Sequence, residues 1–168
     1  DRPSDGIIRV NGLKNKVLKA RIPSLGDQKI TFIQKGLLLH VQGPVREPVG
    51  YDSVVELEVE GEVQAENGFC GEINFGGIQM GQAKAVLTGG VERATGTDVT
   101  GVGYISPTSI RKWNSMNSRA SWKVYMPEEG ERELTICYSC DSLSAGQPYW
   151  VEVEGAGMIE AKTLAGPK

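Results

Sequence analysis

Two groups of glutamates are the residues of this sequence whose type could support acid–base chemistry. They are Glu56, Glu58 and Glu60 in one segment and Glu128, Glu129 and Glu131 in another. Hydrolysis of a glycosidic bond needs two carboxyl groups held about 5–9.5 Å apart, one of them with a perturbed pKa. The alternate spacing of the first group is typical of one exposed strand face, and the second group surrounds a predicted turn at Gly130. We therefore interpret both groups as solvated surface.

His40 is the only histidine in the sequence. A serine or cysteine hydrolase would need it as a general base, and the sequence contains no G-x-S-x-G signature for the nucleophile. Gly101 and Gly103 lack the third glycine and the following helix of a dinucleotide-binding fingerprint. We interpret His40 as a strand residue with a hydrogen-bonding partner, and we predict that this chain alone is not an enzyme.

The three cysteines are Cys70, Cys137 and Cys140. An odd number allows at most one internal disulfide, so one bridge and none both remain open. Cys137 and Cys140 have the C-x-x-C spacing of redox and zinc sites, but residues three apart in a strand lie on opposite faces. A zinc site would also need Cys70 and His40 as further ligands. We expect the cysteines to pack as small core residues, with a bridge from Cys70 to one of the other two as the alternative.

The segment SIRKWNSMN (residues 109–117) combines residue types that bind carbohydrate. Sugar binding needs an aromatic side chain that stacks on the ring and a few polar groups that hydrogen-bond its hydroxyls. Trp113 is the candidate stacking residue, and the other candidates are Arg111, Asn114, Asn117 and Tyr104. The alternative is that Trp113 lies buried under the rim of the fold, because large aromatic side chains are mostly buried.

Loop carboxylates could bind a structural calcium ion, since Ca²⁺ takes carboxylate and carbonyl oxygens. Glu92, Asp98 and Asp141 are the available candidates. Their spacing defines no site. We therefore predict no metal and no cofactor.

The composition favours an all-β fold. The 168 residues include 22 glycines and 8 prolines, and 39% are hydrophobic without long apolar runs, which indicates a turn-rich chain. The net charge of −3 comes from intermixed signs without a basic stripe that alternates with aromatic residues, so we expect no nucleic-acid partner and no membrane span. The sequence begins at Asp1 without a methionine or a signal-peptide pattern, which favours an excised fragment over a processed protein.

Alternation of apolar and polar residues predicts the strands of the first half. In the strand expected at residues 16–22, the residues predicted to face the core are Leu18, Ala20 and Ile22. A second strand is expected at residues 53–63, with three glutamates on its outer face. Like charges on one face repel unless opposite charges lie across from them. Lys19 and Arg21 can provide those charges, which predicts that the two strands are neighbours.

Three further strands are predicted in the second half, at residues 120–126, 133–140 and 149–154, with turns between them. The residues expected in the core of a sandwich are Trp122, Val124, Met126, Leu134, Ile136 and Tyr138. Glycines interrupt every periodic pattern in residues 61–81. The sequence therefore predicts two small antiparallel β-sandwich modules, residues 1–63 and 81–168, joined by a glycine-rich linker at residues 64–80.

Two short segments of the first module resemble a known family. GLKNKV (residues 12–17) and DSVVELEV (residues 52–59) resemble the β-sandwich that follows the catalytic barrel in bacterial α-L-fucosidases. The second module, with a glycine turn, the Tyr104 strand, the Trp113 loop and the Trp122 strand, is similar to galactose-binding-like or carbohydrate-binding jelly-roll sandwiches. Such modules often continue further, which implies that the first is clipped at its N-terminus and the second at its C-terminus.

The resemblance implies a non-catalytic accessory region of a secreted or periplasmic glycoside hydrolase. In that family the catalytic carboxylates belong to the barrel, and no part of this sequence matches it. The implied partners are the barrel of the parent enzyme and a glycan or terminal sugar. Two alternatives remain open, namely a purely structural β-sandwich without a ligand and an adhesion or protein-interaction module, which would expose a contiguous apolar patch.

Overall fold

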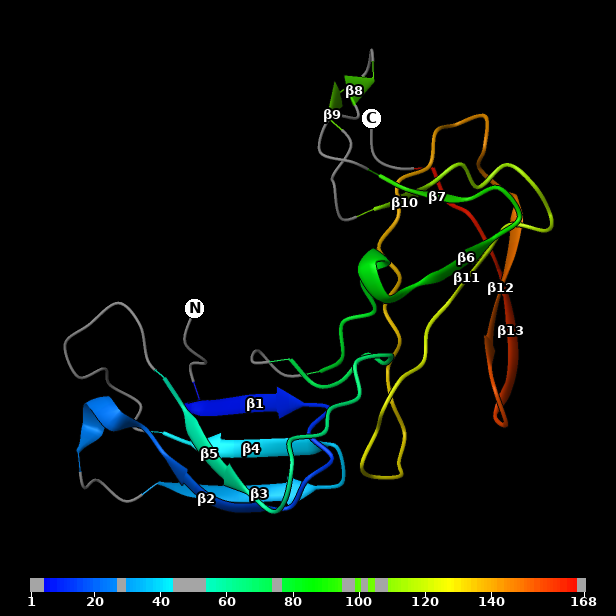
Figure 1. Cartoon of the computed structure of the whole chain (residues 1–168). Coiled ribbons are helices and arrows are strands. Elements are labelled where there is room, and N and C mark those ends of the chain that lie inside the picture. Colours follow the sequence, from blue (N-terminus) through cyan, green and yellow to red (C-terminus); the bar gives the residue numbers. More distant parts are fainter. Residues whose placement is uncertain are drawn as a thin grey trace. The chain divides into compact units, whose positions relative to one another are not determined.

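The structure is a computed structural model that describes residues 5–26, 30–43, 54–73, 77–94, 99–100, 103–104 and 109–165. These residues form an all-β protein of several small antiparallel sheets and two short 3₁₀ helices, as Figure 1 shows. The predicted all-β class is confirmed. Internal contacts divide the chain into two compact units, Asp1–Glu129 and Gly130–Lys168. The expected sandwich arrangement and the expected division at residues 64–80 stay predictions.

Two sheets in the first unit share one apolar core. Strands β1 (Ile7–Asn11), β4 (Leu38–Gln42) and β3 (Thr31–Lys35) form a sheet in the order β1-β4-β3. Strands β2 (Val17–Arg21) and β5 (Glu56–Val59) form the other, and the 3₁₀ helix η1 (Pro23–Leu25) follows β2. The buried residues of this core are Val17, Ala20, Leu39 and Val41. Burial of such side chains from both sheets stabilises the arrangement, at about 1.5–3 kcal/mol for each large apolar side chain.

Strands β2 and β5 are neighbours, as the charge pattern predicts. Lys19 lies opposite Glu58, and Arg21 lies opposite Glu56. The Nε atom of Arg21 donates to Oε2 of Glu56 at 2.6 Å. Each exposed pair of this kind contributes about 0.2–1 kcal/mol, so the pairs select the neighbour more than they stabilise the sheet.

The prediction that Leu18 faces the core is wrong. The pairing of β2 with β5 shifts its register between Val17 and Lys19, which marks a β-bulge or a similar irregularity. Such an insertion breaks the strict alternation of side chains. Val17 and Ala20 are therefore buried, and Leu18 is 50% exposed.

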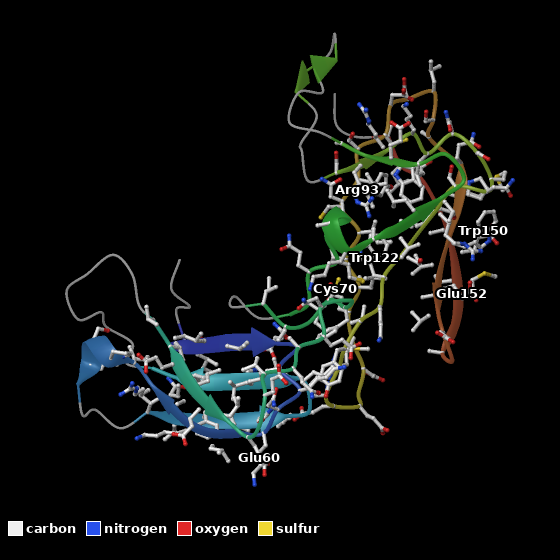
Figure 2. The ribbon with its side chains drawn as sticks, in the orientation of Figure 1. Glu60, Cys70, Arg93, Trp122, Trp150 and Glu152 are labelled. Atoms are coloured by element: carbon white, nitrogen blue, oxygen red, sulfur yellow. The ribbon has the colours of Figure 1, made fainter. Side chains whose placement is uncertain are left out.

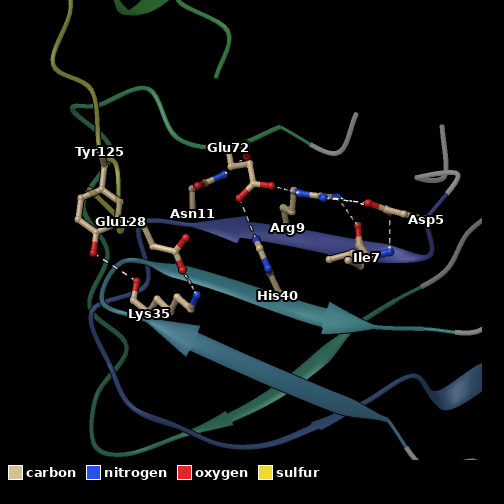
Figure 3. Close-up of polar contacts among 9 residues, drawn as sticks. All are labelled: Asp5, Ile7, Arg9, Asn11, Lys35, His40, Glu72, Tyr125 and Glu128. Carbon is tan, nitrogen blue, oxygen red and sulfur yellow. Dashed lines mark hydrogen bonds and ion pairs between the residues drawn. The ribbon is translucent and has the colours of Figure 1, made fainter. Parts of the chain in front are cut away.

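Residues 64–73 pack against the first sheet. Leu13 forms an isolated bridge with Ala65, and Cys70 forms one with Val124. Phe69 is 2% exposed, and its ring centroid lies 5.5 Å from that of Tyr125. The Tyr125 hydroxyl in turn donates to the carbonyl of Lys35 at 3.2 Å (Figure 3). Tyr125 therefore links Phe69 to the turn between β3 and β4.

Three short two-stranded ribbons complete the first unit. Strand β6 (Val86–Thr88) pairs with β11 (Arg119–Ser121), β7 (Glu92–Arg93) with β10 (Ile110–Arg111), and β8 (Val99–Thr100) with β9 (Gly103–Tyr104). The 3₁₀ helix η2 (Gln82–Lys84) precedes β6. Trp122, labelled in Figure 2, is half-buried and donates Nε1 to the carbonyl of Gly81 at 2.9 Å. The prediction that Trp122 lies in a sandwich core stays a prediction, whereas that for Met126 is wrong, because Met126 is exposed.

The second unit contains one hairpin, β12 (Pro148–Val153) and β13 (Gly157–Lys162). The strand expected at residues 149–154 is confirmed, but residues 133–140 are not a strand. Their alternation suits an extended chain, whereas a strand also needs a hydrogen-bonded neighbour. Tyr138 packs edge-on against Tyr149 with centroids 6.3 Å apart, and its hydroxyl accepts the backbone N–H of Leu164 at 2.9 Å. None of the described residues of this unit is buried, so the predicted core positions of Leu134, Ile136 and Tyr138 are wrong.

Candidate functional site

The loop of residues 112–118 is held at both ends by paired strands. Strand β10 precedes the loop, and its last residue, Arg111, lies opposite Glu92 of β7. Strand β11 follows the loop, and its first residue, Arg119, lies opposite Thr88 of β6. The two partner strands, β6 and β7, are joined through Gly89 and Gly90. A seven-residue loop on one side therefore lies across from a short glycine turn on the other.

Gly89 allows the loop to approach this turn closely. Its φ of +73° favours glycine, and a Cβ atom there would lie 2.0 Å from the carbonyl oxygen of Asn117. Next to this contact, the Ser118 hydroxyl donates to the carbonyl of Gly89 at 3.2 Å. The backbone N–H of Ser118 also donates to the carbonyl of Ser115 at 2.9 Å. These contacts fix the loop on the ribbon by backbone geometry.

Trp113 is an exposed aromatic residue in this loop. Its side chain is 54% exposed, and its Nε1 atom donates to the carbonyl of Ile110 at 3.0 Å. The indole N–H, which is the polar edge of the ring, therefore already has a partner within the chain. The exposed part of the ring is apolar, and stacking on a flat ligand requires such a surface. Met116, three residues further on, is also exposed.

The charged residues before Trp113 converge on one glutamate. The ammonium of Lys112 contacts Glu92 at 2.8 Å, and the guanidinium of Arg111 contacts the same carboxylate at 3.5 Å. The hydrogen bond from Lys112 is the main cause that lowers the pKa of the Glu92 carboxyl below its ordinary value. Lys112 has a φ of +63°, which turns the chain at the base of the loop.

The remaining candidates from the sequence lie in different environments. Asn114 and Asn117 are exposed in the same loop as Trp113. Tyr104 lies in β9, which pairs only with β8 among the described strands, and its side chain is outside the described part of the structure. Arg111 is therefore the last residue of β10, Trp113 and the two asparagines follow it in the 112–118 loop, and Tyr104 belongs to a separate two-stranded sheet.

A second polar cluster, which sequence reasoning missed, lies on β1 and β4 (Figure 3). Arg9 and His40 are opposite each other in the β1–β4 register. Arg9 Nε donates to Glu72 Oε1 at 2.7 Å, and His40 Nε2 donates to Glu72 Oε2 at 3.0 Å. Arg9 also forms an ion pair with Asp5 at 2.8 Å. The prediction that His40 is a strand residue with a partner is confirmed.

The cluster fastens residues 69–73 to the first sheet, because Asn11 also donates its side-chain amide to the carbonyl of Glu72 at 2.8 Å. The only sequence signal was the alternation of polar Arg9 and Asn11 along one strand face. Burial raises the pKa of Glu72, but hydrogen bonds from Arg9 and His40 outweigh burial and hold the pKa below its ordinary value. The carboxylate is therefore more stable in the folded chain than in the unfolded chain.

We expect Glu72→Gln to lose a pH-dependent part of the stability. Because the folded-state pKa of Glu72 is lowered, its contribution is complete above the unfolded-state pKa and is lost as the pH falls through the folded-state pKa. The free energy of unfolding of the wild type should exceed that of the variant by on the order of 1 kcal/mol near neutral pH. This difference should disappear below about pH 4. Urea denaturation of both proteins across this range measures it. A gap that does not change with pH would contradict the prediction.

The cysteines and the calcium candidates form no site in the described part of the chain. All three cysteines are free, so the alternative without a disulfide holds in the structure. Cys70 is buried as expected, and burial raises the pKa of its thiol, whereas Cys137 is exposed and its predicted core role is wrong. No cluster of three or more possible metal ligands occurs among the described residues.

The calcium candidates have other contacts. Glu92 pairs with basic residues, and Asp141 accepts the backbone N–H of Ser144 at 2.7 Å. The side-chain and backbone hydrogen bonds of Ser144 lower the pKa of Asp141. Asp98 lies outside the described residues.

The fold places the chain in the class of all-β proteins with small antiparallel sheets. No family model matches the chain, and comparison with curated proteins and with solved structures finds no match. Within the described segments, no helix has the length and apolar character needed to cross a membrane.

Proposed function

We propose that this chain is a non-catalytic accessory region of a secreted or periplasmic α-L-fucosidase-like glycoside hydrolase, and that it binds a glycan through the 112–118 loop. The observation that supports glycan binding is the exposed indole of Trp113, whose N–H is already bonded to Ile110. Stacking on the C–H face of a sugar uses the accessible apolar ring surface. Asn114 and Asn117, exposed in the same loop, offer amide groups for hydroxyls.

The two segments that carry the family resemblance belong to one small core. Residues 12–17 lead into β2 and residues 56–59 form β5, and Val17 lies opposite Val59 in the β2–β5 pair. Both valines pack in or against the core cluster. Distant parts of the sequence that resemble one family module therefore contact each other, which supports a common module. In the parent enzyme this module would pack beside the catalytic barrel, and the loop would keep glycan near the active site.

We expect Trp113→Ala to reduce glycan affinity about tenfold or more, because loss of the stacking ring removes the central contact. Calorimetric titration of the full chain and of the variant with fucose, galactose and mixed glycans measures the affinity. Trp150→Ala is the matched control, since Trp150 is also exposed but lies on the β12–β13 hairpin. Binding that survives Trp113→Ala would contradict the site. Turnover of p-nitrophenyl fucoside by the chain would contradict the non-catalytic role.

A protein-interaction module is the second candidate, because the β12–β13 hairpin exposes apolar residues. Val151 and Ile159 are cross-strand partners, and Ile159 is 70% exposed. Met158 and Val153 on the same hairpin are exposed as well. A two-stranded hairpin is marginally stable alone, so a covering partner would stabilise it. Absence of any glycan binding would favour this candidate or a purely structural module.

A further inference from the structure

Basic residues surround the Trp113 loop in a chain whose total charge is negative. The two antiparallel segments that carry the loop, residues 86–94 and 109–121, contain four basic residues against a single glutamate, which leaves a formal charge of +3. The basic residues are Arg93, Arg111, Lys112 and Arg119. The complete chain carries −3. The two segments that carry the exposed tryptophan are therefore positive, whereas the chain as a whole is negative.

Among the described residues, the carboxylate of Glu92 pairs with two of these basic side chains, Lys112 and Arg111. Arg93 donates to the backbone carbonyls of Gln82 and Ala85, which satisfies its donors without a negative charge. Arg119 is exposed at the end of the loop and forms no ion pair with a described residue. A positive field therefore remains around the loop, and salt screens it over about 8 Å at physiological ionic strength.

We propose that the ligand of this loop is a sugar that carries a carboxylate or sulfate group. This inference rests on the proposed glycan binding and adds the charge of the ligand. Trp113 stacks on the ring, and the exposed guanidinium of Arg119 attracts the anion. Guanidinium groups suit planar or tetrahedral oxyanions, since they present parallel N–H donors.

The ligand is a sugar with few charges rather than a nucleic acid. Proteins that bind single strands use several aromatic side chains along a continuous basic groove. The 112–118 loop presents one exposed aromatic ring, and the complete chain is negative, which repels a phosphate polymer. A short ligand with one or two negative groups interacts mainly with the local positive charge.

Calorimetric titration of the full chain with galactose, galacturonic acid and a sulfated galactose tests the inference at about 0.02 M and about 0.5 M salt. The acidic sugars should bind more tightly than galactose at low salt, and high salt should remove the preference. Arg119→Gln should weaken binding of the acidic sugars about two- to fivefold and leave galactose binding unchanged. Lys16→Gln, which removes an exposed charge preceding β2, is the matched control.

The outcomes separate this inference from the proposed function. Equal binding of galactose and the acidic sugars, lost in Trp113→Ala, would overturn the anionic ligand and leave glycan binding in place. No binding of any sugar would overturn both. A single-stranded oligonucleotide that binds as tightly as galacturonic acid would overturn the assignment to a sugar.

Discussion

Leu39→Ala is expected to lower the free energy of unfolding by about 2–5 kcal/mol. Leu39 has no exposed surface and lies in β4, the central strand of the β1-β4-β3 sheet. It packs in one cluster with residues of β2, including Val17 and Ala20. Truncation would leave a cavity between two sheets. Backbone hydrogen bonds between the strands hold each sheet in place, so the surroundings can relax only partly.

Leu18→Ala is the matched control for this prediction. It removes the same atoms from a side chain that is half exposed, so the loss should stay below about 1 kcal/mol. Urea denaturation followed by circular dichroism measures both variants. Equal losses would show that the strict alternation of residues 16–22 holds and that β2 is not irregular near Val17. A small loss for Leu39→Ala would contradict the core itself.

Gly12→Ala is expected to destabilise the first unit by about 2–4 kcal/mol. The φ of Gly12 is +92°, and an added Cβ would lie 2.2 Å from the carbonyl oxygen of Glu66. The backbone of Gly12 cannot move away freely, because its N–H donates to Leu37 at 2.7 Å and its carbonyl accepts from Glu66 at 2.8 Å. The substitution should therefore separate residues 64–66 from the end of β1.

Gly61→Ala separates the clash from the backbone strain. Gly61 has a φ of +74°, but a Cβ atom there would meet nothing within 4 Å. The substitution should cost about 1–2 kcal/mol, which is the cost of the left-handed conformation alone. The difference between the two variants, from thermal and urea unfolding, measures the contact with Glu66. Equal losses would mean that Gly12 and Glu66 are not close.

Local patterns in the sequence were enough to predict the all-β class and one strand pair. In the sequence, apolar and polar residues alternate with period two in the segments that contain β2, β5 and β12, and this pattern depends only on neighbouring residues. The pairing of β2 with β5 was predictable because Lys19 and Arg21 have opposite charge to Glu56 and Glu58. The 112–118 loop was also predictable, since the polar residues around Trp113 interrupt the apolar pattern.

Contacts between distant residues were decided only by the tertiary structure. The sequence could not place Glu72 beside Arg9 and His40, because those hydrogen bonds join residues 63 and 32 positions apart. Alternation also could not show which extended segments have a strand partner, because periodicity describes one strand and a sheet requires two. Residues 133–140 form no strand, whereas β13 pairs with β12.

The sequence by itself determined the strand period, the charge complementarity of β2 and β5 and the polar loop around Trp113. The tertiary structure decided the irregular register that exposes Leu18, the cluster around Glu72 and the exposure of Trp113. The physical reason is that periodicity and charge are properties of short segments. Register, burial and hydrogen-bond partners depend on which segments meet, and packing determines that for the chain as a whole.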